Sequence, residues 1–138
     1  MNPRFPLPLA FSLLLSLAAL NIVAERFHLF YIVWWLDIPM HLFGGALGAL
    51  TAVSLYFRAS DPHTKDRGAL LVWLLSIASS LTIGLGWEAF EYLSGKSAPL
   101  GADGLGDTIK DLANDLFGAL LGAKTFLLLS RKREPRGR

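Results

Sequence analysis

Four long apolar stretches constrain this chain more than any other feature. They cover residues 7–24, 36–57, 69–93 and 107–129, and each is 18 to 25 residues long. A helix needs about 17–25 apolar residues to cross a bilayer. Because no water reaches the backbone inside hydrocarbon, such a stretch must satisfy its own hydrogen bonds as a helix. The pattern predicts an all-α integral membrane bundle of four transmembrane helices within residues 1–130.

The composition supports a membrane protein and excludes some chemistry. Hydrophobic residues make up 53% of the 138 residues and charged residues only 17%, whereas about 25% charged residues is usual for a soluble domain. The chain has no cysteine, so disulfides and thiolate chemistry are excluded.

The first apolar stretch has two interpretations. A basic residue, Arg4, followed by a leucine-rich run is typical both of a signal peptide and of an uncleaved anchor. The segment Ile22-Val23-Ala24 supplies only one small residue, which is a poor cleavage signature and favours the anchor. Cleavage would leave the other three helices unchanged.

The distribution of basic residues predicts the orientation. The N-terminal segment, the 58–67 loop and the 131–138 tail together hold nine Lys and Arg residues, whereas the other two loops hold only Arg26 and Lys96. Cytoplasmic flanks carry the excess of positive charge, so we expect both termini in the cytoplasm. A basic tail after an apolar helix favours contact with anionic lipid head groups over nucleic acid.

The last apolar stretch begins with a polar face. At 100° per residue one stripe holds Asp107, Asp111, Asn114 and Gly118, and the opposite face holds Ile109, Leu112, Leu116 and Leu120. An ionised carboxylate at the centre of the hydrocarbon costs about 2.5–3.5 kcal/mol on insertion scales. The acidic stripe should therefore face other parts of the chain.

Two other helices carry polar pairs at the same predicted depth. With both termini in the cytoplasm and four spans, the start of the second span, the end of the third and the start of the fourth lie in the outer leaflet. Pairs three or four residues apart share a helix face. The predicted site therefore consists of Asp37 and His41, Glu88 and Glu91, and Asp107 and Asp111.

Carboxylates around one imidazole cannot all be ionised and unpaired in a low dielectric. A divalent cation is one solution: imidazole and carboxylates suit zinc, manganese or iron, and oxygens alone suit magnesium or calcium. Shared protons are a second solution. Salt bridges to Arg26, Lys96 or Lys110 are a third.

Structural roles compete with the site interpretation for several residues. Asp37 and Asp107 are suitable helix N-caps, and Asp111 interacts well with the positive end of a helix dipole. Glu88 and Glu91 lie near the C-terminal end of their own helix, where the helix dipole disfavours negative charge. A capping or dipole role therefore does not explain them. Two further positions have simple interpretations: Asp115, at the margin of the acidic stripe, as a partner of Lys110 or of a neighbouring helix, and Trp87 as an interface anchor.

These residues resemble a known family. The motifs are Asp37-x-x-x-His41, Glu88-x-x-Glu91-Tyr92, and Asp107-Thr108-x-x-Asp111-Leu112 followed by Gly118-Ala119. Their order is similar to the YjdF-like uncharacterised inner-membrane proteins of bacteria and, more distantly, to the VanZ-like family. The resemblance covers the second to fourth spans and implies a multi-pass protein of the bacterial inner membrane.

Three functions fit these observations. The first is a metal-dependent hydrolase or transferase that acts on a lipid or envelope precursor at the outer leaflet, with Glu88 or Glu91 as general base and the 94–106 loop as a lid. The second is a proton- or cation-coupled transporter, whose path would need a homo-oligomer interface. The third is an accessory protein in which the polar cluster only holds the helices together.

Overall fold

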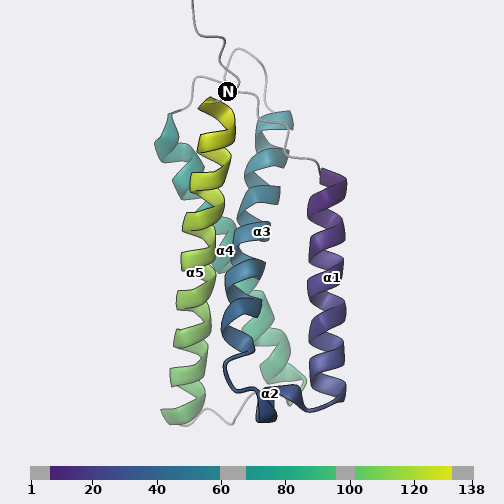
Figure 1. The fold of residues 1–138 in the computed structure, drawn as a ribbon. Coiled ribbons are helices and arrows are strands. Elements are labelled where there is room, and N and C mark those ends of the chain that lie inside the picture. The colour runs from purple at the N-terminus through teal and green to yellow at the C-terminus, as the bar shows by residue number, and fades with distance from the viewer. Residues whose placement is uncertain (1–6, 60–67, 96–101, 132–138) are drawn as a thin grey trace, which may run out of the picture.

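The chain forms a bundle of four long helices, as predicted. The computed structural model describes residues 7–59, 68–95 and 102–131. Within them lie α1 (Leu7–Arg26), α2 (Leu29–Ile32), α3 (Asp37–Ala59), α4 (Ala69–Leu93) and α5 (Ala102–Arg131). The four long helices are each long and apolar enough to cross a membrane. They alternate in direction, so the start of α1 and the end of α5 lie at the same end of the bundle (Figure 1).

Helices α1, α3 and α4 begin and end within two residues of the apolar stretches in the sequence, whereas α5 begins earlier. This helix begins at Ala102, five residues before the predicted start, which places Asp107 inside the helix and contradicts its interpretation as an N-cap. Gly104 and Gly106 cost only about 1 kcal/mol each relative to alanine, and glycine is common in transmembrane helices. These two glycines therefore do not prevent the helix from extending.

Several predicted features lie outside the described residues. They are the N-terminal Arg4, most of the polar 58–67 loop, the centre of the proposed lid with Lys96, and the tail beyond Arg131. The cytoplasmic location of both termini stays a prediction.

Helix α3 lies at the centre of the bundle and approaches α5 at backbone contact. A Cβ atom at Gly118 of α5 would overlap the backbone of Leu42 and Ala46, and one at Gly122 would lie 2.7 Å from the Ala46 carbonyl oxygen. A Cβ at Gly45 of α3 would in turn overlap the backbone of Asp115. Small residues let transmembrane helices pack this closely, so the polar starts of α3 and α5 meet directly.

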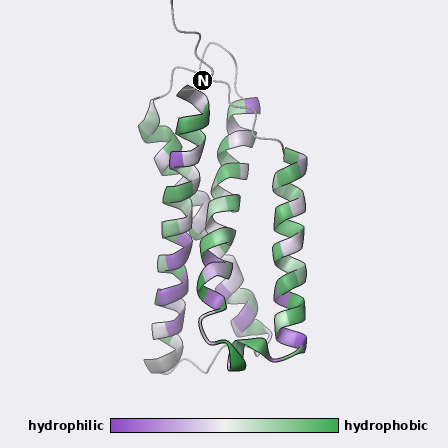
Figure 2. Cartoon of the chain, in the orientation of Figure 1, coloured by the Kyte–Doolittle hydropathy of each residue, from purple (hydrophilic) through white to green (hydrophobic). Residues whose placement is uncertain are grey.

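The two ends of the bundle differ in polarity. Apolar side chains fill the core at the end away from α2, where the Phe57 and Phe126 rings lie 5.4 Å apart. Hydrophilic residues gather toward the α2 end (Figure 2). Helix α1 is peripheral, and only Ala10 and Ala24 are buried along it. The outer surface is largely apolar, as a lipid-facing surface requires.

The close α3–α5 contact predicts unequal effects of two glycine substitutions. Gly118→Ala should destabilise the protein by about 1–3 kcal/mol, because the methyl group overpacks the interface. Gly86→Ala, whose methyl group meets no atom within 4 Å, should be neutral or stabilising by up to about 1 kcal/mol. Thermal unfolding in detergent measures both, and equal melting temperatures would contradict the packing described.

Candidate functional site

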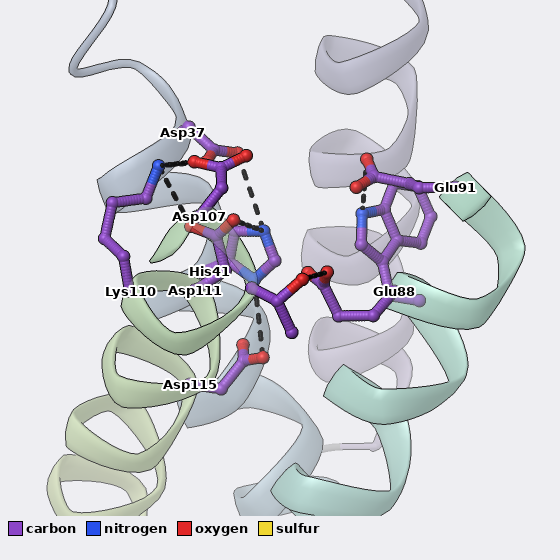
Figure 3. Close-up of polar contacts among 10 residues, drawn as sticks. Asp37, His41, Glu88, Glu91, Asp107, Lys110, Asp111 and Asp115 are labelled. Carbon is purple, nitrogen blue, oxygen red and sulfur yellow. Dashed lines mark hydrogen bonds and ion pairs between the residues drawn. The ribbon is translucent and has the colours of Figure 1, made fainter. Parts of the chain in front are cut away.

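His41 occupies the centre of a polar cluster between α3 and α5. Its side chain is buried, and its Nδ1 lies 3.3 Å from Asp115 Oδ2. When Asp115 is ionised it can only accept, and Nδ1 then carries the proton of this hydrogen bond. The other ring nitrogen, Nε2, lies 3.5 Å from Asp37 Oδ1 and 4.0 Å from Asp111 Oδ2 (Figure 3). Three aspartates thus surround one imidazole.

Lys110 provides a positive charge on the outer side of the cluster. Its Nζ lies 2.6 Å from Asp107 Oδ1, 3.1 Å from Asp37 Oδ2 and 3.3 Å from Asp111 Oδ1. The salt-bridge solution predicted from the sequence is therefore confirmed for Lys110. Asp37 and Asp111 each direct one oxygen toward Lys110 and the other toward His41.

The aspartates of the cluster differ in how well they are satisfied. The Asp111 side chain is only 4% exposed, and its Oδ1 accepts no hydrogen bond although Lys110 Nζ is near. Asp107 is 65% exposed and lies at the rim. Asp115 is buried, and its backbone carbonyl accepts a hydrogen bond of 2.9 Å from Ser80 of α4.

Three of the six predicted ligands form a compact group. Asp37, His41 and Asp111 each offer one ligand atom, and these atoms lie within 4.8 Å of one another. Asp107 and the two glutamates do not belong to this group. The sequence predicts that all six residues lie at the same end of the bundle. Which of them come close together depends on how each helix is rotated about its axis.

The two glutamates of α4 have partners of their own. Glu88 Oε2 accepts a hydrogen bond of 2.6 Å from Thr108 of α5, while its buried Oε1 accepts none. Glu91 Oε1 accepts a hydrogen bond of 2.9 Å from Trp87 Nε1. Trp87 therefore has a polar role within the bundle beyond that of an interface anchor.

The sequence left two partners open for Asp115, Lys110 or a neighbouring helix, and the structure shows the second, since Asp115 pairs with His41 of α3. This residue follows Asp111 by four positions, so it lies about 40° from it around the helix, the same offset as Asp107. The structure places it inward against His41, while Asp107 lies at the exposed rim.

An acidic cavity of about 550 Å³ opens beside the cluster. Glu91 lines it together with Asp37, Asp107, Lys110 and Asp111. Its remaining walls come from the α1–α2 region and the end of α4: Glu25, His28, Phe30, Tyr31, Trp34 and Gly95. The site is thus accessible from one end of the bundle.

The bond between Thr108 and Glu88 predicts a measurable loss of stability on its removal. Thr108→Val leaves the Glu88 carboxylate without its 2.6 Å hydrogen bond and should cost about 1–3 kcal/mol. Thr125→Val is the matched control, because this hydroxyl is exposed and bonds only to the Leu121 carbonyl of its own helix. Chemical unfolding in detergent compares the variants, and an equal loss in both would show that the Glu88 contact does not matter.

The comparisons with known proteins point to one family. Residues 1–132 match the family model described as "Predicted membrane protein (DUF2238)". Comparisons with curated proteins and with solved structures gave no match. The family match includes every residue of the polar cluster and all four long helices. The chain belongs to the DUF2238 family of membrane proteins.

Proposed function

We propose that Asp37, His41 and Asp111 bind a divalent metal ion, and that the protein is a hydrolase or transferase acting on a lipid or envelope precursor. The environment of His41 carries this proposal. With the Nδ1 proton directed at Asp115, a neutral imidazole presents the Nε2 lone pair to the oxygens of Asp37 and Asp111. Acceptors that face one another in this way require a proton or a cation between them.

The distances suit a metal ion with small adjustments. Nitrogen and oxygen ligands at about 2.0–2.1 Å from a tetrahedral ion lie about 3.4 Å from one another. The Nε2 separations of 3.5 Å to Asp37 and 4.0 Å to Asp111 are close to this value. A carboxylate that accepts the other histidine proton, as Asp115 does, is the usual support of a metal-binding histidine.

The ligand types favour some metals over others. One imidazole and two carboxylates suit zinc, manganese or iron better than magnesium or calcium. Three protein ligands leave a coordination position open, as in catalytic zinc sites. Lys110 neutralises the outer oxygens of Asp37 and Asp111 and so reduces the excess negative charge that one ion has to balance.

The chemistry proposed for this site is hydrolysis or group transfer. A bound divalent ion would polarise a phosphoryl or carbonyl oxygen and supply an activated water. Glu91 lines the same cavity as Asp37 and Asp111 and is the better placed of the two proposed bases. Glu88 bonds to Thr108 between α4 and α5, which suits a positioning role. The excess of basic residues in the N-terminal, 58–67 and 131–138 segments of the sequence supports a cavity on the extracytoplasmic side of a bacterial inner membrane.

Proton-coupled transport is a second candidate, favoured by buried hydroxyl groups in the core. Ser80 lies next to Asp115, and the fully buried Ser54 and Ser76 have Oγ atoms that accept and donate no hydrogen bond. Internal waters commonly satisfy such groups and would extend a polar path from His41. Proton flux in vesicles that disappears in Ser76→Ala, with intact folding, would favour transport over hydrolysis.

Metal analysis of the purified protein tests the proposal first. The unaltered chain should retain roughly one zinc, manganese or iron ion, as a three-ligand site would, and the His41→Ala/Asp111→Ala double variant should retain none. Asp115→Asn should lower the affinity about 10–100-fold, because it removes only the support of His41. Asp107→Asn is the control outside the compact group. Equal, negligible metal in all variants would end the proposal and leave a doubly protonated His41 as the balancing cation of an accessory protein.

The catalytic role of Glu91 is tested separately from metal binding. Glu91→Gln should keep the metal but lower turnover of lipids in a bacterial lipid extract by about 10²–10⁴-fold, as expected when a general base is lost. Mass spectrometry of the lipids before and after incubation measures this turnover. Unchanged turnover in Glu91→Gln would exclude it as the base.

A further inference from the structure

A second, apolar cavity runs along the membrane-embedded part of the bundle. Its volume is about 420 Å³, and it lies between α1, α3 and α4. We call it the apolar groove. Leu14 and Leu17 of α1, Gly44 and Leu55 of α3, and Ile83 of α4 contribute to its walls. At one end it reaches the polar cluster, where its lining residues are Asp37, His41, Trp87 and Asp115.

We propose that the apolar groove holds one acyl chain of a membrane phospholipid with an amine head group, which lies in the acidic cavity. This inference rests on the proposed function, since it names the class of lipid for that site. Asp37 lines both the groove and the acidic cavity. A molecule with an apolar tail and a polar head can therefore occupy both while passing the metal-binding group.

The dimensions of the groove fit a single chain. From His41 to Leu55 it follows 14 residues of α3, which is about 21 Å at 1.5 Å per residue. One leaflet of the hydrocarbon core is about 15 Å thick, so an acyl chain fits along it. A helix about 10 Å wide and 21 Å long fills roughly 1,600 Å³, whereas the volume of the groove is about 420 Å³. The groove is too narrow for a helix of a second copy.

The surroundings of the groove also favour lipid. Helix α1 is peripheral, and its outer residues are exposed over most of its length. In a bilayer, the medium around such a helix is hydrocarbon. The walls of the groove are mainly aliphatic side chains and glycine, with Asn21 and Thr51 as polar residues besides those of the cluster. An acyl chain is the molecule available there with matching chemistry.

The charges of the acidic cavity select the head group. Five acidic residues line it together with Lys110: Glu25, Asp37, Glu91, Asp107 and Asp111. Even with a divalent ion bound, these carboxylates outnumber the positive charges. The cavity also has an aromatic wall, to which Phe30, Tyr31 and Trp34 contribute. Acids and aromatic rings together attract an ammonium group and disfavour a head group with only negative charge.

Photolabelling tests the occupant directly. The full chain in detergent is exposed to two lipids with the same photoactivatable acyl chain, phosphatidylethanolamine and phosphatidylglycerol. Phosphatidylethanolamine should label peptides of α1 and α3 more strongly. Gly44→Leu should lose this labelling: a Cβ there contacts only the Leu17 side chain, at 3.7 Å, so the rest of the leucine enters the groove. Gly86→Leu, which meets open space, is the matched control and should retain it.

A second variant distinguishes a filled groove from a misfolded protein, because Gly44→Leu could lose the labelling by failing to fold. Ala18→Phe fills the groove from the peripheral helix α1 without touching the α3–α5 interface, and it should lose the labelling too. Labelling in the groove-filling variants equal to that of Gly86→Leu would overturn the proposal. Equal or stronger labelling by phosphatidylglycerol would overturn it as well, and so would crosslinks between two copies through α1.

Failure of this inference is distinguishable from failure of the proposed function. A chelator removes the metal but leaves every residue of the groove and of the acidic cavity in place, so the chelated protein should still be labelled. Metal bound without groove labelling would reject the acyl-chain site and keep the metal site. Groove labelling without bound metal would keep the lipid site and reject the metal-dependent chemistry.

Discussion

The structure depends on one constraint: carboxylates within a membrane bundle need partners from other helices. Asp111 and Asp115 are buried on α5, and the neighbouring helix α3 supplies the histidine that lies against both of them. The glycines that bring the two backbones into contact make this possible. At that distance His41 of α3 reaches both carboxylates. Close helix packing and charge compensation are therefore parts of the same interaction.

The cluster has more acid than its two basic side chains balance. Lys110 lies among three aspartates on the outer side, and His41 lies among three on the inner side, with Asp37 and Asp111 common to both. A purely structural cluster would be expected to end with matched charges, since an unpaired buried charge destabilises a protein. The remaining negative charge, and an Asp111 oxygen that accepts no hydrogen bond, are the features expected where a cation or substrate binds.

The position of the cluster in the bundle is as informative as its composition. It lies where a polar cavity at the end of the bundle meets an apolar groove within the membrane. A protein that served only as a membrane anchor would not need a polar cavity that meets an apolar groove. A site that handles amphipathic molecules needs both environments within reach of the same side chains, and Asp37 contributes to both.

The sequence alone determined the number of long helices, most of their boundaries and the end of the bundle that collects the acids. These features follow from the length and periodicity of apolar stretches, which are local properties of the chain. Only the tertiary structure decided which polar groups meet. Asp115 pairs with His41, and Lys110 pairs with three other aspartates. Glu88 and Glu91 of α4 bond instead to Thr108 and Trp87. The rotation of each helix about its axis makes this difference, because it results from packing between residues far apart in the sequence.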